Sequence, residues 1–438
     1  MDRSDLTVCE LFAGVGGFHL GLSRGGWRII WADQWEPGKK RQYAFECYDR
    51  HFPGIGINED ISIVDVGRIP DHRLLVGGFP CQDYSVATAN AHGIEGKKGV
   101  LWWEIHRILK GKLEAGNPVP FVLLENVDRL LKSPAKQRGR DFGIILSCLN
   151  QLGYTAEWRM VNAADYGFPQ KRRRTFIFGT LVKDVADKLY LNKDGEEIAT
   201  MSGFFAPCLP SRLNASSVGS TCHVWDDLVD MSDTFRFDFE NAGHMRHGKV
   251  HTVRVTPDYG GDRRTLGDVL EEDVGEEFFV ADEEVGSESD PLEKYRKSWR
   301  YCKGAKSEPR RTKKGYEYCY TEGAIPFPDR LDEPSRTMLT SEANRRPNRI
   351  SHVVLDPRAK RYRLITPIEA ERLNGFEDGW TEGMPRTWRY FCMGNALVVG
   401  LPELMGTRLA DIISGLGGAP FEAIRPRKAS RKRIDEYR

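Results

Sequence analysis

A cysteine in the setting of a reactive residue lies within the stretch GGFPCQDYS, which runs from Gly77 to Ser85. Cys81 directly follows a proline at the end of an apolar run, and polar residues come after it. The nine cysteines of the chain form no C-x-x-C pair and have no nearby histidine spacing, so we expect neither a metal site nor a disulfide framework. We interpret Cys81 as a candidate nucleophile, because a thiolate in a loop can be activated by its surroundings. An inert core cysteine is the alternative.

Acidic and basic side chains stand at the ends of two later apolar runs. Glu125 follows PFVLL, 44 residues after Cys81, and a carboxyl group that emerges from an apolar strand can act as an acid. In PQKRRRTFIFG, Gln170, Arg172 and Arg174 alternate, which puts the two arginines on one face of a strand that enters the core. We expect these groups to point toward a site. The alternatives are a salt-bridged acid at a strand end and a solvated basic face.

A glycine-rich turn between a strand and a helix, ELFAGVGGF, is typical of a loop that approaches a ligand closely. The dinucleotide fingerprint G-x-G-x-x-G would require a glycine at position 19, where the chain has His19. Asp33 ends the next strand, where an acid can accept hydrogen bonds from ribose hydroxyls. Both observations fit a cofactor that carries adenosine without a diphosphate, and S-adenosylmethionine is such a cofactor. A purely structural tight turn is the alternative.

Alternating strands and helices in the first 180 residues must position these groups. The runs LTVCELFAG, RIIWAD, HRLLVGGFP, PFVLLENV and RRTFIFGT indicate strands, with helical stretches between them. The alternation predicts an α/β fold with a doubly wound, mostly parallel, Rossmann-like sheet and a second, smaller domain. Ligands of such sheets bind at the carboxyl ends of the strands, and the residues singled out above fall there.

The character of the sequence changes at about Leu181, where periodicity weakens and Gly, Pro, Asp and Arg become frequent. We expect four parts: residues 1–180 as the first part of a catalytic domain, 181–330 as a smaller domain, 331–420 as a return to the catalytic domain with a C-terminal helix, and 421–438 as a disordered basic tail.

Charge is unevenly distributed, although the net charge is only +1. Residues 271–293 hold eleven acidic residues and no basic one, whereas residues 294–316 hold ten Lys or Arg and one Glu, with aromatic residues between them. The basic run suits phosphate contacts and base stacking, so we expect it to line a DNA-sized cleft. The acidic run should face away from DNA or shield the cleft, and a solvated loop is the alternative.

Features of membrane and secreted proteins are missing from the sequence. No run approaches the roughly 18 consecutive apolar residues that a membrane span needs, and MDRSDLTVCELF lacks the pattern of a signal peptide. We therefore expect a reduced cytoplasmic protein that contacts no membrane.

Taken together, these stretches resemble the DNA (cytosine-5)-methyltransferases. The resemblance rests on FAGVGGF, GGFPCQDYS, GKKGVLWWEI, ENV, NAADYGFPQKRRR, EPSRTMLT, RLITPIEAERLNGF and GNALVVG, which follow the family's order. They cover the chain to about residue 180 and again from about 330 to 413. The region between them occupies the place of the family's variable target-recognition domain. In the family, the matching cysteine attacks carbon 6 of a flipped cytosine, and carbon 5 then takes the methyl group of S-adenosylmethionine.

The resemblance also implies roles for individual residues. Glu125 would hold or protonate ring nitrogen 3, Arg172 would bond the ring carbonyl, and Arg174 completes the catalytic set. Asp33 stands where many members have Glu, which shortens the reach to the ribose. The implied cofactor contacts are Phe12, Ala13, Gly14, Gly16, Gly17, Asp33, Asp60, Ile61, Pro80, Leu101 and Asn395. The expected DNA contacts are Gln82, Ser85, Gln170, Arg310, Arg311, Lys313 and Lys314.

Three other functions remain open at this level. One is an RNA methyltransferase of the same fold, against which the long middle region argues. Another is a Rossmann oxidoreductase, against which the absent third glycine argues, and the third is a catalytically silent DNA-binding protein. The standalone chain resembles a prokaryotic modification enzyme, so we expect a monomer that acts on double-stranded DNA, associates with the nucleoid and is paired with a restriction endonuclease. The recognition sequence depends on side chains that the sequence cannot place.

Overall fold

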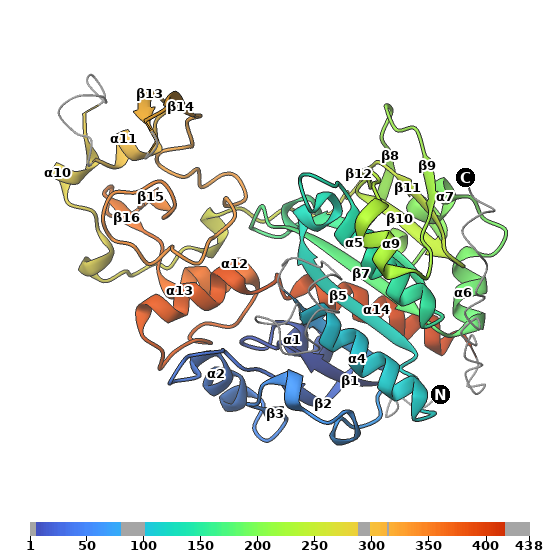
Figure 1. Cartoon of the computed structure of the whole chain (residues 1–438). Helices are drawn as coiled ribbons and strands as arrows, with labels where there is room; N and C mark the ends of the chain where they lie inside the picture. The colour runs from blue at the N-terminus through green and yellow to red at the C-terminus, as the bar shows by residue number, and fades with distance from the viewer. Residues whose placement is uncertain (1–5, 80–100, 288–297, 313–314, 417–438) are drawn as a thin grey trace. The chain divides into compact units, whose positions relative to one another are not determined.

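The computed structural model describes residues 6–79, 101–287, 298–312 and 315–416, which form two compact units (Figure 1). The first unit comprises residues Met1–Tyr166, Arg173–Gly260 and Val399–Arg438, and the second comprises Gly167–Arg172 and Gly261–Val398. Among the described residues, no helix has both the length and the apolar character needed to cross a membrane.

A ten-stranded sheet in the order β3-β2-β1-β4-β5-β7-β6-β10-β11-β9 forms the centre of the first unit. Its parallel part consists of β1 (Thr7–Leu11), β2 (Arg28–Asp33), β3 (Gly56–Ile57), β4 (Leu74–Gly78) and β5 (Phe121–Val127). The central strands β1, β4 and β5 are mostly buried, and apolar residues and glycine make up most of their length. This arrangement confirms the predicted α/β class and brings the carboxyl ends of the parallel strands to one edge.

The other part of the sheet is antiparallel. It contains β6 (Thr155–Asn162), β7 (Arg173–Thr180), β9 (Ser220–His223), β10 (Ala242–Arg246) and β11 (Lys249–Val253). The sequence placed residues 181–330 in a separate domain, but the structure puts residues up to Gly260 in the first unit. The reason is physical: β10 and β11 extend the sheet and bury Met245, Val250 and Val253.

Helices cover this sheet on both faces (Figure 1). The main ones are α1 (Gly17–Arg24), α2 (Tyr43–His51), α4 (Leu101–Glu114), α5 (Arg140–Gln151), α6 (Lys183–Tyr190) and α14 (Gly400–Ser414). Shorter elements are α7 (Gly195–Glu197), α8 (Phe205–Cys208), α9 (Leu228–Thr234), β8 (Ser211–Leu213) and β12 (Val255–Pro257). Helix α14 packs against α1, where the Trp27 indole donates to the Gly406 carbonyl at 2.8 Å.

The second unit has less regular structure. Its elements are α10 (Asp282–Val285), α11 (Trp299–Lys303), β13 (Lys306–Arg311), β14 (Glu317–Glu322), β15 (Val353–Leu355), β16 (Tyr362–Leu364), α12 (Pro367–Asn374) and α13 (Arg386–Asn395). Helix α12 begins with the predicted capping box of Thr366 and Glu369, with Pro367 at its first position. Arg363 is fully buried and pairs with Asp356 and Glu369, each at 2.7 Å. Charged groups thus help to hold this unit together beside a small apolar core.

Candidate active site

The glycine-rich loop after β1 adopts the backbone geometry that its composition predicts. Phe12, Gly14 and Gly16 have φ values of 56°, 58° and 89°, which lie in the left-handed region. Glycine is favoured there because a side chain adds strain, and a Cβ on Gly16 would come within 2.5 Å of the Phe52 ring. A Cβ on Gly14 would meet no atom within 4 Å, so the backbone at Gly14 faces open space that a ligand can approach.

Asp33 stands at the end of β2, beside this loop. Its backbone carbonyl accepts a hydrogen bond from the Ala13 amide at 2.9 Å, which fixes the loop to the strand end. The side chain is only 2% exposed, and its Oδ1 has no hydrogen-bond partner among the described residues. Burial, with the nearby Asp60 carboxylate, raises the pKa of Asp33 to about 8. A buried acceptor left without a donor is costly, so Asp33 fits a ligand that brings hydroxyl groups.

Gln34 is a neighbour of the loop that sequence reasoning missed. Its Oε1 accepts a hydrogen bond from the Gly14 amide at 2.6 Å, and Asn58 donates to its backbone carbonyl at 2.6 Å. The side chain is buried although it follows the last residue of β2. Gln34 directly follows Asp33 at a strand end that faces a glycine loop, and this position could have indicated its role. Gln34 therefore joins Asp33 in the wall of the candidate cofactor site.

Asp60, Ile61 and Leu101 lie in the same unit. Asp60 caps a short 3₁₀ segment by accepting hydrogen bonds from the Ser62 amide and hydroxyl, at 3.0 and 2.8 Å. Ile61 is buried in the main core, and Leu101 begins α4 with its side chain half-buried. Asp60 also acts on Asp33, because it contributes to the raised pKa of that carboxyl group. Asn395 belongs to the second unit, where it is exposed at the end of α13.

The ends of β4 and β5 hold the chain immediately before the candidate nucleophile. The Phe79 amide donates to the Glu125 carbonyl at 3.3 Å, and the buried Asn126 amide group donates to the Phe79 carbonyl at 2.7 Å. A Cβ on Gly78 would stand 3.0 Å from Glu125 Oε2, so glycine permits the close approach of the two strand ends. Pro80, Cys81, Gln82 and Ser85 lie outside the described residues, but the segment that leads to them is fixed to Glu125 and Asn126.

Glu125 and Arg174 form a close ion pair at this edge. Arg174 Nε lies 2.5 Å from Glu125 Oε1, and their side chains are 16% and 13% exposed. The register of β5 with β7 brings them together, since Val127 lies opposite Arg174 and the side chain of Glu125 shares its face. A carboxyl group and a guanidinium held together near a strand end can bind a ring that presents both an acceptor and a donor.

Arg172 has a different environment. The expectation that Arg172 and Arg174 share one strand face is wrong, because β7 begins at Arg173 and Arg172 belongs to the second unit. Its guanidinium is buried and donates to the Gly394 carbonyl at 2.9 Å and to the Met338 carbonyl at 3.4 Å. Gln170 is equally buried and bonds the Met338 amide and Asn374. These contacts indicate that both residues hold the second unit together.

Four of the described cysteines have surroundings that do not favour a nucleophile. Burial raises the pKa of Cys148, Cys208 and Cys222 to about 12, and it also raises the pKa of Cys9. A thiol with a raised pKa stays protonated at neutral pH and is a poor nucleophile. Within the described part of the chain, no group of three or more His, Cys, Asp or Glu could hold a metal ion.

The basic run of the second unit is divided between buried and exposed positions. Lys303 is 1% exposed, burial lowers its pKa to about 8, and it donates to the Arg349 carbonyl at 3.1 Å. Arg310 lies 3.6 Å from the centre of the Tyr320 ring, and Arg311 pairs with Glu317 at 3.2 Å. Lys313 and Lys314 fall outside the described residues. The basic run therefore does not act as one uniform surface.

The acidic run is partly neutralised within the same unit. Glu272 pairs with Arg358 at 2.8 Å, and Glu276 pairs with Arg361 at 2.6 Å. Both acids are exposed, Glu272 at 78% and Glu276 at 74%, so these surface pairs agree with the solvated-loop alternative as well.

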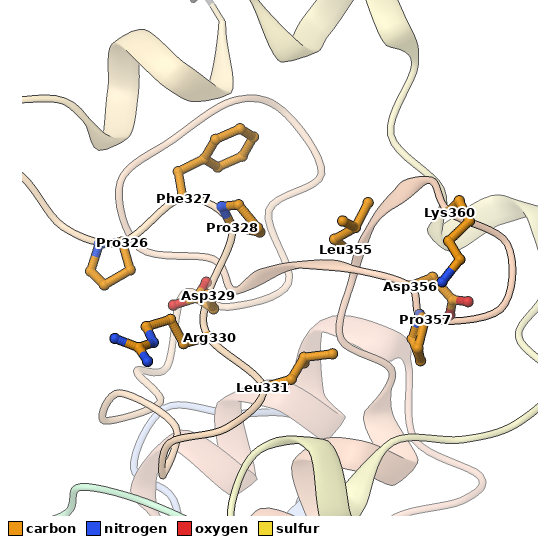
Figure 2. Close-up of a pocket in the computed structure, with 10 residues that line it drawn as sticks. All are labelled: Pro326, Phe327, Pro328, Asp329, Arg330, Leu331, Leu355, Asp356, Pro357 and Lys360. Carbon is orange, nitrogen blue, oxygen red and sulfur yellow. The ribbon is translucent and has the colours of Figure 1, made fainter.

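A recess of about 590 Å³ opens in the second unit (Figure 2). Its lining residues come from two segments, 326–331 and 355–360. Both of its acids already have partners, since Asp329 binds Arg336 at 2.5 Å and Asp356 binds Arg363 at 2.7 Å. None of the site residues expected from the sequence lines this recess. We therefore place the candidate active site at the strand ends of the first unit.

Comparisons with known proteins identify the family of the chain. The family model of C-5 cytosine-specific DNA methylases matches residues 6–411. Over 420 residues the chain is 46% identical to Type II methyltransferase M.Sau3AI of Staphylococcus aureus. The match covers 93% of this chain and 96% of that protein. Over 411 residues it is 26% identical to Type II methyltransferase M.NlaX of Neisseria lactamica, with 93% and 97% covered.

Solved structures show the same architecture. The chain resembles a mutant of Spodoptera frugiperda DNMT2 with a TM-score of 0.55 and 16% identity, over 93% of this chain and 99% of that one. It resembles the Dnmt2 methyltransferase of S. pombe with a TM-score of 0.53 and 14% identity, over 94% and 99%. At these identities the likeness shows the shared fold.

Proposed function

The chain belongs to the C-5 cytosine-specific DNA methylases, and from that premise we propose that it methylates carbon 5 of a cytosine within a specific duplex sequence through a covalent Cys81 adduct. The observation that supports this best is the edge formed by β4 and β5. There Phe79, two residues before Cys81, is bonded to Glu125 and Asn126. The same edge holds the Glu125–Arg174 pair.

The proposed methyl donor is S-adenosylmethionine, in keeping with the family. When bound, it supplies an electrophilic methyl group. The residues present fit it: Asp33 offers a buried acceptor without a donor, Gly14 leaves open space, and Gln34 closes the loop beside them. Asp33 would accept from the ribose hydroxyls, and the glycine loop would let the backbone approach the ligand.

The reaction would begin when the Cys81 thiolate forms a bond to carbon 6 of a cytosine that has left the base stack. The electron pair of the 5,6 double bond moves toward carbon 5, and Glu125 holds or protonates ring nitrogen 3 as charge builds there. Carbon 5 would then form a bond to the methyl group, whose bond to the sulfonium sulfur of the donor would break and leave a neutral thioether. A base then removes the proton at carbon 5, the sulfur–carbon bond breaks, and the double bond and the thiolate are restored.

Arg174 is a better candidate than Arg172 for the group that bonds the ring carbonyl. Arg174 is held beside Glu125, whereas Arg172 donates to two backbone carbonyls of the second unit. We assign Arg172 and Gln170 the role of positioning residues. In this assignment Glu125 and Arg174 bind adjacent positions of one pyrimidine ring, which presents nitrogen 3 beside its carbonyl group.

The second unit, residues 261–398 with 167–172, is proposed to select the DNA sequence. The relatives that match over nearly their whole length are named Type II methyltransferases. Their names support a role in restriction and modification, in which the enzyme protects duplex DNA from a cognate endonuclease. RNA as the substrate finds no support in these full-length relatives.

The covalent step can be tested with duplex DNA that contains 5-fluorocytosine. Fluorine at carbon 5 blocks the final elimination, so the wild-type protein should form an adduct that survives denaturing electrophoresis. Cys81→Ser should form none and transfer no methyl group, because a hydroxyl is a far poorer nucleophile at neutral pH. Cys222→Ser is the matched control and should behave as wild type, because burial raises the pKa of that thiol to about 12. Substantial turnover by Cys81→Ser would exclude the covalent mechanism.

A further inference from the structure

The hairpin of β13 and β14 has two faces with different surroundings. The strands pair in antiparallel register, and directly opposed residues share a face. We call one set the anchored face and the other the outer face. The anchored face consists of Lys306, Glu308, Arg310, Tyr318, Tyr320 and Glu322, and the outer face consists of Ser307, Pro309, Arg311, Glu317, Cys319 and Thr321.

The anchored face is fixed to the body of the second unit. Glu308 accepts a hydrogen bond from the Tyr301 hydroxyl of α11, and Lys306 donates to the Cys302 carbonyl at 3.3 Å. Glu322 pairs with Lys306 at 3.2 Å and with Arg349 at 3.0 Å. Toward the end of the hairpin, the Arg310 guanidinium stacks on Tyr320. These contacts hold the ribbon in a defined orientation from one side only.

All six residues of the outer face are exposed. Apart from Pro309 their side chains can donate or accept hydrogen bonds, and none is a large apolar group. Ser307, Cys319 and Thr321 are short, so the backbone of the ribbon can come close to whatever the face meets. Arg311 and Glu317 add a strong donor and a strong acceptor, 3.2 Å apart.

From these observations we propose that the outer face of the β13–β14 hairpin enters the major groove of duplex DNA and reads base edges there. This inference rests on the proposed function and assigns sequence selection to six residues. The major groove is about 12 Å wide and admits a two-stranded ribbon, and base edges in it present mixed donors and acceptors. The segment 306–322 contains five Lys or Arg and three Glu, and each of the three acids has a partner within this unit. The ribbon is thus positive overall, as a polyanionic partner requires.

Another protein fits this face less well. Interface cores are rich in aromatic side chains, which the outer face lacks. Pro309 has no N–H, so β13 cannot accept a further strand along its whole outer edge. A surface that binds only phosphate groups would carry unpaired positive side chains, whereas Arg311 forms an ion pair with Glu317. A balanced pair flanked by hydroxyl groups suits base edges better.

The test uses two variants of the full chain that keep its net charge. Arg311→Gln with Glu317→Gln removes the balanced pair, and Ser307→Ala with Thr321→Val removes two hydroxyl groups. Thr221→Val is the matched control, because Thr221 is an exposed strand threonine in β9 of the first unit. Duplexes bound from a randomised pool are sequenced, methylated cytosines are mapped, and the salt dependence of binding is measured on one fixed duplex. Unchanged unfolding midpoints confirm folding.

The charge-balanced variants should lose discrimination between preferred and other duplexes by about tenfold or more, while the salt slope stays that of wild type. The control should keep the wild-type preference. If both hairpin variants select the same sequences as wild type, or weaken binding to all duplexes with a smaller salt slope, the assignment is overturned. If the wild-type protein selects certain duplexes but transfers no methyl group, the proposed function fails. The sequences of the bound duplexes would then still test the role of the hairpin.

Discussion

Binding of S-adenosylmethionine should release a proton from Asp33. The buried carboxyl group has a pKa of about 8 in the ligand-free protein, so about 0.9 of it is protonated at pH 7. Ribose hydroxyls that donate to the carboxylate favour its charged form. If the pKa falls well below 7 in the complex, about 0.9 proton leaves per cofactor bound at pH 7. The affinity should then rise about fiftyfold between pH 6 and pH 8 and level off above pH 8.

The same shift has a consequence for stability with the opposite trend. The unfolded carboxyl group ionises near pH 3.8, whereas the folded group keeps its proton up to about pH 8. The ligand-free protein therefore loses stability as the pH rises through this window, by at most about 6 kcal/mol. Bound cofactor should remove this loss, so its protection against unfolding should grow with pH.

Isothermal calorimetry in buffers with different ionisation enthalpies measures the released proton directly. Asp33→Asn serves as the reference, because it subtracts the protons that the cofactor's own amino group exchanges. Asp60→Asn should lower the pKa of Asp33 and reduce the release, since the Asp60 carboxylate contributes to the shift. Asp65→Asn is its matched control, because Asp65 caps a similar 3₁₀ segment by accepting from the Gly67 amide. Equal proton release by wild type and Asp33→Asn would refute the reasoning.

Three further predictions concern catalysis and recognition. Glu125→Gln should lower the single-turnover rate by roughly 10²-fold while the Kd for DNA stays within a factor of a few, because the carboxyl group acts on charge that builds on the ring. A variant that lost only DNA affinity would contradict this role. Arg174→Ala should also lower the single-turnover rate. Arg172→Ala should mainly lower the unfolding midpoint, because it removes donors to two buried carbonyls and reduces the free energy of unfolding by about 2–4 kcal/mol. The reverse pattern would restore Arg172 as the ring-binding residue. Exchange of residues 261–398 for those of a relative should change which cytosine is methylated, as read by bisulfite sequencing, and an active chimera with the original pattern would exclude the recognition role.

Local patterns predicted the parallel part of the fold and singled out the candidate cofactor site. Apolar runs, a glycine loop and polar residues at strand ends are adjacent in sequence, and the sheet brings these ends to one edge whatever the details of packing. Asp33 and Glu125 were found in this way. Gln34 escaped because its role depends on a hydrogen bond to Gly14, twenty positions away.

Long-range pairing could not be predicted. Strands β9, β10 and β11 are short, and the first reads STCH, with two of its four residues exposed. Their place beside β6 is set by partners distant in the chain, which weak periodicity does not reveal. The same limit misplaced Arg172, since alternation applies only within a strand, and β7 begins one residue later. Sequence alone could not show where that strand starts.

The packing of α1 against α14 has a consequence for biosynthesis. Trp27 bonds Gly406 across 379 positions, and Gly21 fits so closely under Val399 that a Cβ there would lie 2.4 Å from its carbonyl oxygen. At roughly 5–20 residues per second, a ribosome needs on the order of 20–80 seconds to make the chain between these contacts. Throughout that time the face of α1 that α14 covers stays open to water and to other nascent chains. Helix α1 is thus covered only after α14 has been made, and a chain that stops before residue 400 never covers it.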